Sequence, residues 1–268
     1  MKRRTWFSII AIVIILCVYG YEHFLVEAET SEIISKGKEA KANTNEFFLP
    51  TSTTQQIVHH NGYSLSYSET HEQAEWVAYE LKKSHLSNTN HKRPYFEIDK
   101  AVKSGAASWR NYKNSGYDRG HLCPAGDRRY TKAAHDETFL TSNISPQDHQ
   151  FNAGIWNRLE QKVRYWSRKY DGVFVVTGGV LRGDMESIGS EGVSVPNQFY
   201  KVLIDNNTGK TKMIAFLMPH EDSNKPLYEF IVSVDEVEAL TGIDFFPELE
   251  DELESKLEAS RSYKDWSF

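Results

Sequence analysis

The sequence predicts an α+β domain with a mixed, largely antiparallel sheet flanked by helices. Predicted strands and helices occur in blocks along the chain and do not alternate regularly, which is typical of α+β proteins. Two apolar stretches, 199–204 and 213–217, are joined by a turn-rich segment, Asp205–Lys210, that suits a hairpin between antiparallel strands.

The N-terminal residues predict a membrane anchor or a signal segment over residues 1–28. Lys2, Arg3 and Arg4 precede an apolar run of about 16 residues, slightly short for a membrane-spanning helix and slightly long for the apolar part of a signal peptide. Basic residues before such a run stay in the cytoplasm, so the rest of the chain is expected outside it. Whether the segment is cleaved stays open.

The remaining chain divides into a linker and one domain. Residues 29–56 are polar and lack sustained periodicity, which indicates a linker. Residues 57–268 are enough for one sizeable core. The two cysteines are Cys17 and Cys123, and Cys17 lies in the N-terminal apolar run, so no disulfide is expected in the domain.

The first half of the domain predicts a strand followed by a helix. Residues 63–68 alternate between apolar and polar, as in a half-buried strand. Thr70 and Gln73 have the spacing of a capping box, and an apolar stripe follows, so a helix is predicted over 71–83. Residues 93–99 are expected to be extended.

The second half supplies the other sheet elements. Apolar residues at helical spacing predict a helix from Asn152 to about Tyr170, and residues 173–177 form an apolar run suited to a buried strand. The hairpin over 199–217 follows, residues 230–234 are a further strand candidate, and short helices are expected in the C-terminal region.

Asp118-Arg119-Gly120-His121 is the stretch with the clearest chemical potential. Histidine is the usual base near neutral pH, and an adjacent arginine matches a phosphate. The glycine suggests a turn at which the backbone approaches closely. The chain has ten histidines, however, and a histidine chosen at random is more often a surface or hydrogen-bonded residue than a base.

Asn152 and Glu160 are candidate ligands for a hard metal. They are eight positions apart, about two turns and about 80° of rotation on a helix, so both can face one cleft. Mg²⁺ prefers oxygen ligands and keeps several waters, which suits one amide oxygen and one carboxylate. A helix cap at Asn152 and a solvated Glu160 are the simpler alternatives.

Together these residues resemble the signature of the DNA/RNA non-specific endonuclease family, which has a ββα-metal, or His-Me finger, site. The residues that carry the resemblance are Asp118, Arg119, Gly120, His121, Asn143, Pro146, Gln147, Asn152, Trp156, Leu159 and Glu160. The resemblance implies a ββα-metal motif, DNA and RNA as substrates, and 5′-phosphate products. It also leaves a mitochondrial inner-membrane location and a homodimer open.

The resemblance also implies a role for each site residue. His121 would be the general base, Asn152 the direct Mg²⁺ ligand, and Glu160 a ligand through water, with Mn²⁺ as a possible substitute. Asn143 and Arg119 would support the phosphate, and Arg93 would contact it from upstream.

The charge pattern indicates how a nucleic acid would be bound. The formal net charge is −6, with acidic residues crowded near the C-terminus and basic residues around His121 and on the helix that follows. This pattern predicts contacts with the nucleic-acid backbone without readout of bases.

Two functions other than a nuclease stay open at this point. The first alternative is a membrane-tethered nucleic-acid receptor without cleavage. The second is a thiol enzyme that uses Cys123.

Overall fold

A computed structural model of the protein describes residues 48–207 and 209–268. The predicted N-terminal segment, 1–28, and most of the predicted linker lie outside the described residues. Among the described residues, no helix has the length and apolarity needed to cross a membrane.

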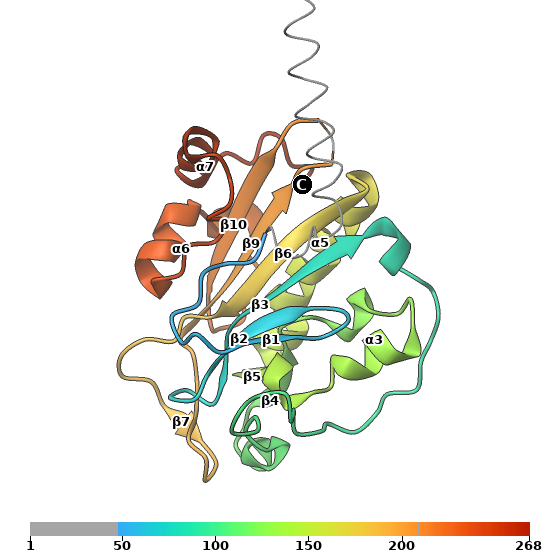
Figure 1. Cartoon of the computed structure of the whole chain (residues 1–268), viewed down its shortest axis with the longest axis vertical. Helices are drawn as coiled ribbons and strands as arrows, with labels where there is room; N and C mark the ends of the chain where they lie inside the picture. Colours follow the sequence, from blue (N-terminus) through green and yellow to red (C-terminus); the bar gives the residue numbers. More distant parts are fainter. Residues whose placement is uncertain (1–47, 208) are drawn as a thin grey trace, which may run out of the picture. The chain divides into compact units, whose positions relative to one another are not determined.

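A seven-stranded antiparallel sheet forms the centre of the domain (Figure 1). Its strand order is β1-β2-β3-β6-β9-β10-β11, and neighbouring strands pair antiparallel throughout. The strands are β1 (Ile57–His59), β2 (Ser64–Ser68), β3 (Gln73–Lys82), β6 (Gly172–Gly179), β9 (Gln198–Asp205), β10 (Lys212–Pro219) and β11 (Ile231–Val232). The predicted α+β class is therefore confirmed, as is the hairpin formed by β9 and β10.

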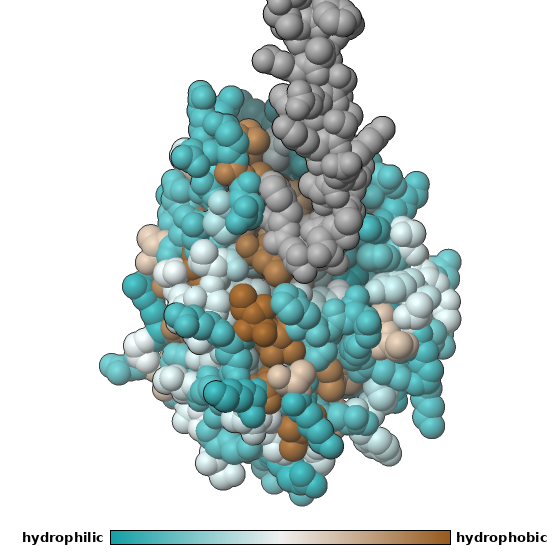
Figure 2. All heavy atoms as spheres, viewed as in Figure 1, coloured by the Kyte–Doolittle hydropathy of each residue, from teal (hydrophilic) through white to brown (hydrophobic). Residues whose placement is uncertain are grey.

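Helices cover both faces of this sheet. On one face α5 (Asn157–Lys169) buries Leu159, Val163 and Trp166 against the strands. On the other face α6 (Val234–Thr241) and α7 (Asp251–Glu258) pack on a second apolar cluster (Figure 1). The face with α6 and α7 is mostly hydrophilic, with a narrow hydrophobic strip over the strands (Figure 2).

A small hairpin lies beside the main sheet and leads into α5. Strand β4 (Asp118–His121) pairs antiparallel with β5 (Ile144–Gln147). After β5 the chain enters α4 (His149–Phe151), a kinked helical segment η6 (Asn152–Trp156) and then α5. Two strands followed by a helix are the predicted ββα arrangement.

Shorter elements complete the described chain. They are α3 (Lys132–Glu137), β7 (Ser187–Ile188), β8 (Val193–Ser194), and the 3₁₀ turns η2 (Lys83–His85), η3 (Trp109–Tyr112), η4 (Ala125–Asp127), η5 (Thr141–Asn143) and η7 (Leu227–Phe230).

Two local predictions were wrong, and a third was right in kind but too long. The helix predicted over 71–83 is strand β3, which lies between β2 and β6 and is buried on both faces, so apolar residues occupy both sides of it. The stretch from Asp118 to His121 is a strand and not a turn. The strand predicted over 230–234 is present but shorter, since β11 covers two residues before α6 begins at Val234.

Residues 48–56, which we assigned to the linker, pack on the sheet. Phe48 is buried in the apolar cluster under α6 and α7. The Trp76 indole donates to the Thr51 carbonyl at 2.9 Å, and the Thr53 amide donates to Glu75 Oε1 at 3.0 Å. The segment that precedes β1 is therefore held to β3 by side-chain hydrogen bonds.

Candidate active site

The β4–β5 hairpin holds His121 at its end. Alternation along β4 places Arg119 and His121 on one face, and Asp118 and Gly120 on the other. At Gly120 an added Cβ would lie 2.1 Å from Oε1 of Gln147, a buried side chain of β5. The glycine is therefore required by a close approach across the hairpin and not by a turn.

The His121 imidazole is enclosed by two aromatic rings. The Phe96 and Phe139 centroids lie 5.5 and 4.9 Å from its own. Nε2 is buried and has no hydrogen-bond partner, which leaves Nδ1 as the ring nitrogen open to the adjoining pocket. Burial, and then the positive charge of Arg93, lower the pKa of His121 to about 3, so the ring is neutral at physiological pH.

A kink in the chain lies between Asn152 and Glu160, whose side chains reach the same pocket. In an uninterrupted α-helix, eight positions leave an offset of about 80°. Within η6 (Asn152–Trp156) the backbone of Gly154 leaves helical geometry (φ −92°, ψ −108°), so the chain kinks between the two residues and this offset does not apply. Both side chains line one pocket.

Asp118 fixes the orientation of the Asn152 amide. Asn152 Nδ2 donates to Asp118 Oδ2 at 3.0 Å. An ionised carboxylate only accepts hydrogen bonds, so the amide nitrogen must face Asp118, and Oδ1 points away from it as a free acceptor. His149 Nδ1 contacts the same carboxylate oxygen at 2.9 Å.

One pocket of about 420 Å³ collects the candidate chemistry. It contains the predicted base and both predicted metal ligands. Its lining consists of Leu86, Ser87, Asn88, His121, Pro124, Ala125, Gly126, Arg129, Asn152, Asn157, Glu160, Arg164 and Arg168. The structure thus brings His121, Asn152 and Glu160 together.

Glu160 belongs to a charged network beneath this pocket. Arg164 Nη2 donates to Glu160 Oε2 at 3.2 Å, and Arg164 Nε donates to the buried Asp127 at 2.6 Å. Lys201, fully buried on β9, donates to Thr177 Oγ1 at 3.1 Å. Burial raises the pKa of Glu160, opposed by the charges of Arg164 and Lys201, and burial lowers the pKa of Lys201.

Arg119 and Arg93 lie in a groove next to His121. The guanidinium carbon of Arg119 is 5.1 Å from the Phe96 ring centroid, and that of Arg93 is 5.7 Å from it. Lys92, Pro94, Tyr95 and Trp109 complete the groove. Tyr95 is 93% exposed, so an aromatic face is available beside two cations.

Asn143 lies behind the pocket. It has no exposed surface, accepts from the Cys123 amide at 2.8 Å and donates to the carbonyls of Cys123 and Thr138, both at 2.9 Å. Its amide therefore braces the chain that follows His121 and does not line the pocket.

Two other residues near the motif are buried. Burial raises the pKa of the Cys123 thiol to about 12, so this thiol is not a nucleophile at neutral pH. Arg128, counted with the basic residues around His121, has no exposed surface and donates to the carbonyls of Asp127 and Glu80, both at 3.0 Å. It supports the fold and does not contribute to a basic surface.

Three residues in or beneath the pocket were not predicted from the sequence. Asn157 lies one helical turn before Glu160, a spacing that a search along the helix for pocket-facing polar residues can find. Asp127 and Lys201 lie far along the chain from Glu160. The sequence carries no signal that they meet, because a strand and a turn from other parts of the fold bring them there.

Residues 40–252 match the family model described as DNA/RNA non-specific endonuclease. The chain belongs to this family. The match covers the hairpin, η6 and α5, which are the elements that form the pocket.

Named relatives agree with this assignment. The mitochondrial nuclease EXOG of Homo sapiens is 32% identical over 232 residues, which are 80% of this chain and 63% of that protein. Mitochondrial endonuclease G of Homo sapiens is 32% identical, with 72% of this chain and 70% of that protein covered. Nuclease C1 of Cunninghamella echinulata var. echinulata is 32% identical over 76% of this chain and 87% of that protein.

A solved structure shares the fold. It is a chain of the EndoG/EndoGI complex, with a TM-score of 0.69 and 31% sequence identity. The similarity covers 74% of this chain and 88% of the other chain. The match to the EXOG nucleases spans only 63–64% of their length in Homo sapiens and Danio rerio.

Proposed function

We propose that this protein is a Mg²⁺-dependent endonuclease that hydrolyses phosphodiester bonds of DNA and RNA and leaves 5′-phosphate ends. The observation that carries the proposal is the convergence of His121, Asn152 and Glu160 on one pocket lined by arginines. The nuclease names of the relatives support the same class of reaction.

His121 is the general base in this proposal. A base must hold a free lone pair at the working pH, and the lowered pKa of His121 keeps its ring neutral. Phe96 and Phe139 fix the ring plane. Nδ1 then takes the proton of the water that attacks phosphorus. A bound phosphate offsets the charge of Arg93, which makes the imidazole a better proton acceptor when substrate is present.

The donor set of the pocket fits a hard divalent ion. Asn152 Oδ1 is a free acceptor oriented by Asp118, and Glu160 is a partly buried carboxylate with cations on one side. Asn152 would hold Mg²⁺ directly and Glu160 through water. The ion supplies positive charge that stabilises the phosphate oxygens and the departing 3′ oxygen.

The groove beside His121 suits the strand that carries the scissile phosphate. Arg119 and Arg93 stabilise the charge that develops on the phosphate. Tyr95 offers a face on which a base of any identity can stack. These contacts read neither base edges nor the 2′-hydroxyl, so DNA and RNA are both accepted.

The compartment is part of the proposal. The N-terminal apolar run supports delivery of the nuclease domain across a membrane, with residues 1–28 as anchor or signal and residues 29–47 as a linker. The mitochondrial relatives support the mitochondrion as the alternative destination. Sequencing the N-terminus of the mature protein decides whether the leader is removed.

Plasmid nicking with and without EDTA tests the proposed reaction. The wild type should nick with Mg²⁺ and stop with EDTA, and His121→Ala should lose a factor of about 10²–10⁴ in rate. Cys123→Ser is the control for a thiol mechanism and should keep its activity. Cutting that survives both EDTA and His121→Ala would overturn the proposal. Binding without cutting by the wild type would instead favour the receptor alternative.

The product ends test the proposed direction of cleavage. Nicked plasmid with 5′-phosphate and 3′-hydroxyl ends should be resealed by a DNA ligase without prior kinase treatment. If ligation requires prior treatment with a phosphatase and a kinase, the products carry 3′-phosphate and 5′-hydroxyl ends, which would contradict the proposed cleavage.

A further inference from the structure

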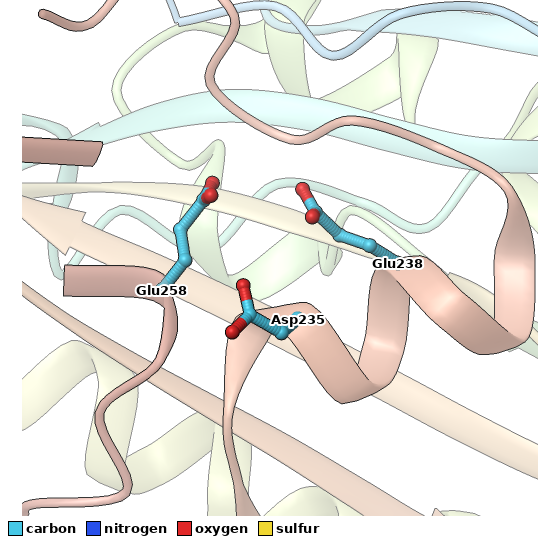
Figure 3. Close-up of side chains that lie close together, drawn as sticks. All are labelled: Asp235, Glu238 and Glu258. Carbon is cyan, nitrogen blue, oxygen red and sulfur yellow. The ribbon is translucent and has the colours of Figure 1, made fainter. Parts of the chain in front are cut away.

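A cluster of five carboxylates lies between α6 and α7. Figure 3 shows Asp235 and Glu238 on α6 and Glu258 on α7 with their carboxylates turned toward one another. One ligand atom from each of these three lies within 4.8 Å of the others, and the same holds for Asp244, Glu254 and Glu258. Glu258 is therefore common to both groups.

Glu258 is buried without a partner for one of its oxygens. Its side chain is only 6% exposed, and Oε1 is inaccessible and makes no hydrogen bond. Glu254 Oε1, one helical turn earlier, is also buried and makes no hydrogen bond. A buried acceptor that lacks a donor is costly, and two carboxylates at i and i+4 also repel each other.

No basic side chain compensates the cluster within residues 48–207 and 209–268. Arg261 pairs with Glu236, which lies outside the cluster. Glu238 accepts only the Phe245 amide, at 3.0 Å through Oε1. The carboxylates of the cluster therefore lack a positive partner among these residues, and a bound cation would supply one.

We propose that this cluster is a calcium-binding site centred on Glu258, separate from the nuclease pocket. Carboxylate oxygens on three segments match the hard-oxygen preference of Ca²⁺ and its tolerance of irregular geometry. Mg²⁺ demands a tighter octahedral geometry and sheds its water reluctantly, so it is the poorer fit. The catalytic pocket lies with α5 on the other face of the sheet.

Bound calcium joins the C-terminal helices. Asp235 and Glu238 come from α6, Asp244 from the loop that follows, and Glu254 and Glu258 from α7. An ion held by these groups replaces their mutual repulsion with attraction, and so fixes α7 onto α6. The expected result is a domain whose unfolding temperature depends on calcium.

Calcium titration of the full-length protein after removal of metals tests this site. The Asn152→Ala variant serves as background, because it removes the proposed catalytic ligand. Isothermal titration calorimetry should detect Ca²⁺ binding in this variant, with a Kd on the order of 10⁻⁴ M. At about 100 times the Kd, the Tm should rise by roughly 5–10 °C.

Glu258→Gln and Glu252→Gln are the matched pair for this test. Both change a glutamate of α7, but only Glu258 belongs to the cluster. Glu258→Gln should weaken Ca²⁺ binding by at least about tenfold and abolish most of the Tm shift. Glu252→Gln should retain both, and Mg²⁺-dependent nicking by either variant without the background mutation reports that it is folded. Equal Ca²⁺ affinity in the two variants, or no Ca²⁺-dependent Tm shift in the background protein, would overturn the proposal.

Discussion

The side-chain amide of Asn152 shows how one hydrogen bond determines what a residue can bind. If Asp118 were absent, rotation by 180° would exchange the amide nitrogen and oxygen at little cost. The carboxylate of Asp118 accepts the amide nitrogen and so presents Oδ1 to the pocket. Partners of this kind commonly tune the affinity of a metal site.

Asp118→Ala should raise the Mg²⁺ concentration needed for half-maximal nicking by about 10–100-fold, because the Asn152 amide is no longer oriented. Asp118→Asn should lose less, since its own Oδ1 can still accept from Asn152. His149→Ala is the control. It removes the other contact of Asp118 and leaves the bond to Asn152. An Mg²⁺ dependence unchanged in Asp118→Ala would show that the bond has no role in metal binding.

The stability of the protein should fall as pH falls from about 6.5 to about 4, partly through His85. Burial, and then the charges of Arg128 and Lys82, lower the pKa of His85 to about 4 in the folded state, from an ordinary value near 6.5. Between these values the unfolded chain binds the proton and the folded protein does not. Acidification therefore favours unfolding over this range.

Urea unfolding at pH 7.5, 6 and 5 measures this effect of His85. His85→Gln should show a smaller loss of unfolding free energy between pH 7.5 and 5 than the wild type. The pKa of His121 is shifted in the same direction, so part of the loss should remain in the variant. An identical loss in both proteins would exclude His85 as a contributor.

At the level of elements, the predictable part of the site is the part that is local in sequence. His121, Asn152 and Glu160 were candidates because their residue types and spacing match the chemistry. The kink in η6 was not predicted, because a glycine inside a helical pattern, here Gly154, is compatible with a continuous helix as well as with a break. The spacing suggested a shared cleft, but across the kink the repeat of an uninterrupted helix no longer describes how the two side chains are oriented.

Strand β3 shows why a helical pattern can mislead. Ala74, Val77, Ala78 and Leu81 are at helical spacing, but β3 has neighbours on both edges and apolar clusters on both faces. In a strand that is buried on both faces, apolar and polar residues need not alternate. Its apolar residues can then occur at the spacing expected for one face of a helix. This ambiguity is resolved only by the tertiary structure.

The close approach within the β4–β5 hairpin gives a prediction at this scale. Gly120→Ala should destabilise the protein by about 1–3 kcal/mol, because its Cβ overlaps the buried Gln147 side chain. Nicking should fall as the strand that holds His121 shifts. The free energy of unfolding in urea and the nicking rate are the two measurements.

Gln147 supplies the control for this prediction. Its amide atoms are buried without hydrogen-bond partners, so Gln147→Ala alone removes no hydrogen bond. The double variant Gly120→Ala/Gln147→Ala should recover most of the stability that Gly120→Ala loses. Failure of the double variant to recover would place the cause of the loss elsewhere in the hairpin.

The whole molecule separates its charges between the two faces of the sheet. Carboxylates gather at α6 and α7, whereas Arg129, Arg164 and Arg168 line the pocket beside α5. A net charge of −6 is thus compatible with a nucleic-acid substrate. The acidic C-terminal region was evident from the sequence, but the burial of Arg128 and the pairing of Arg164 with Asp127 were not, because both depend on tertiary contacts.

Binding of DNA by the inactive His121→Ala variant should weaken with salt. If Arg93, Arg119, Arg129 and Arg168 each contact a phosphate, the slope of log K against log salt concentration should be roughly −3 to −4. Arg168→Gln should reduce the slope by about 0.9. Lys162→Gln, on the same helix but directed to the Ser267 carbonyl, should leave it unchanged. A slope near zero would argue against backbone contacts.

The most direct test of the account is to locate the metal. Crystals of the full-length protein grown with Mn²⁺ in place of Mg²⁺ would reveal the ion by anomalous scattering. We predict a peak in the pocket about 2 Å from Asn152 Oδ1, on the Glu160 side. Anomalous density with no peak near Asn152, in a protein that still nicks plasmid with Mn²⁺, would contradict the proposed active site.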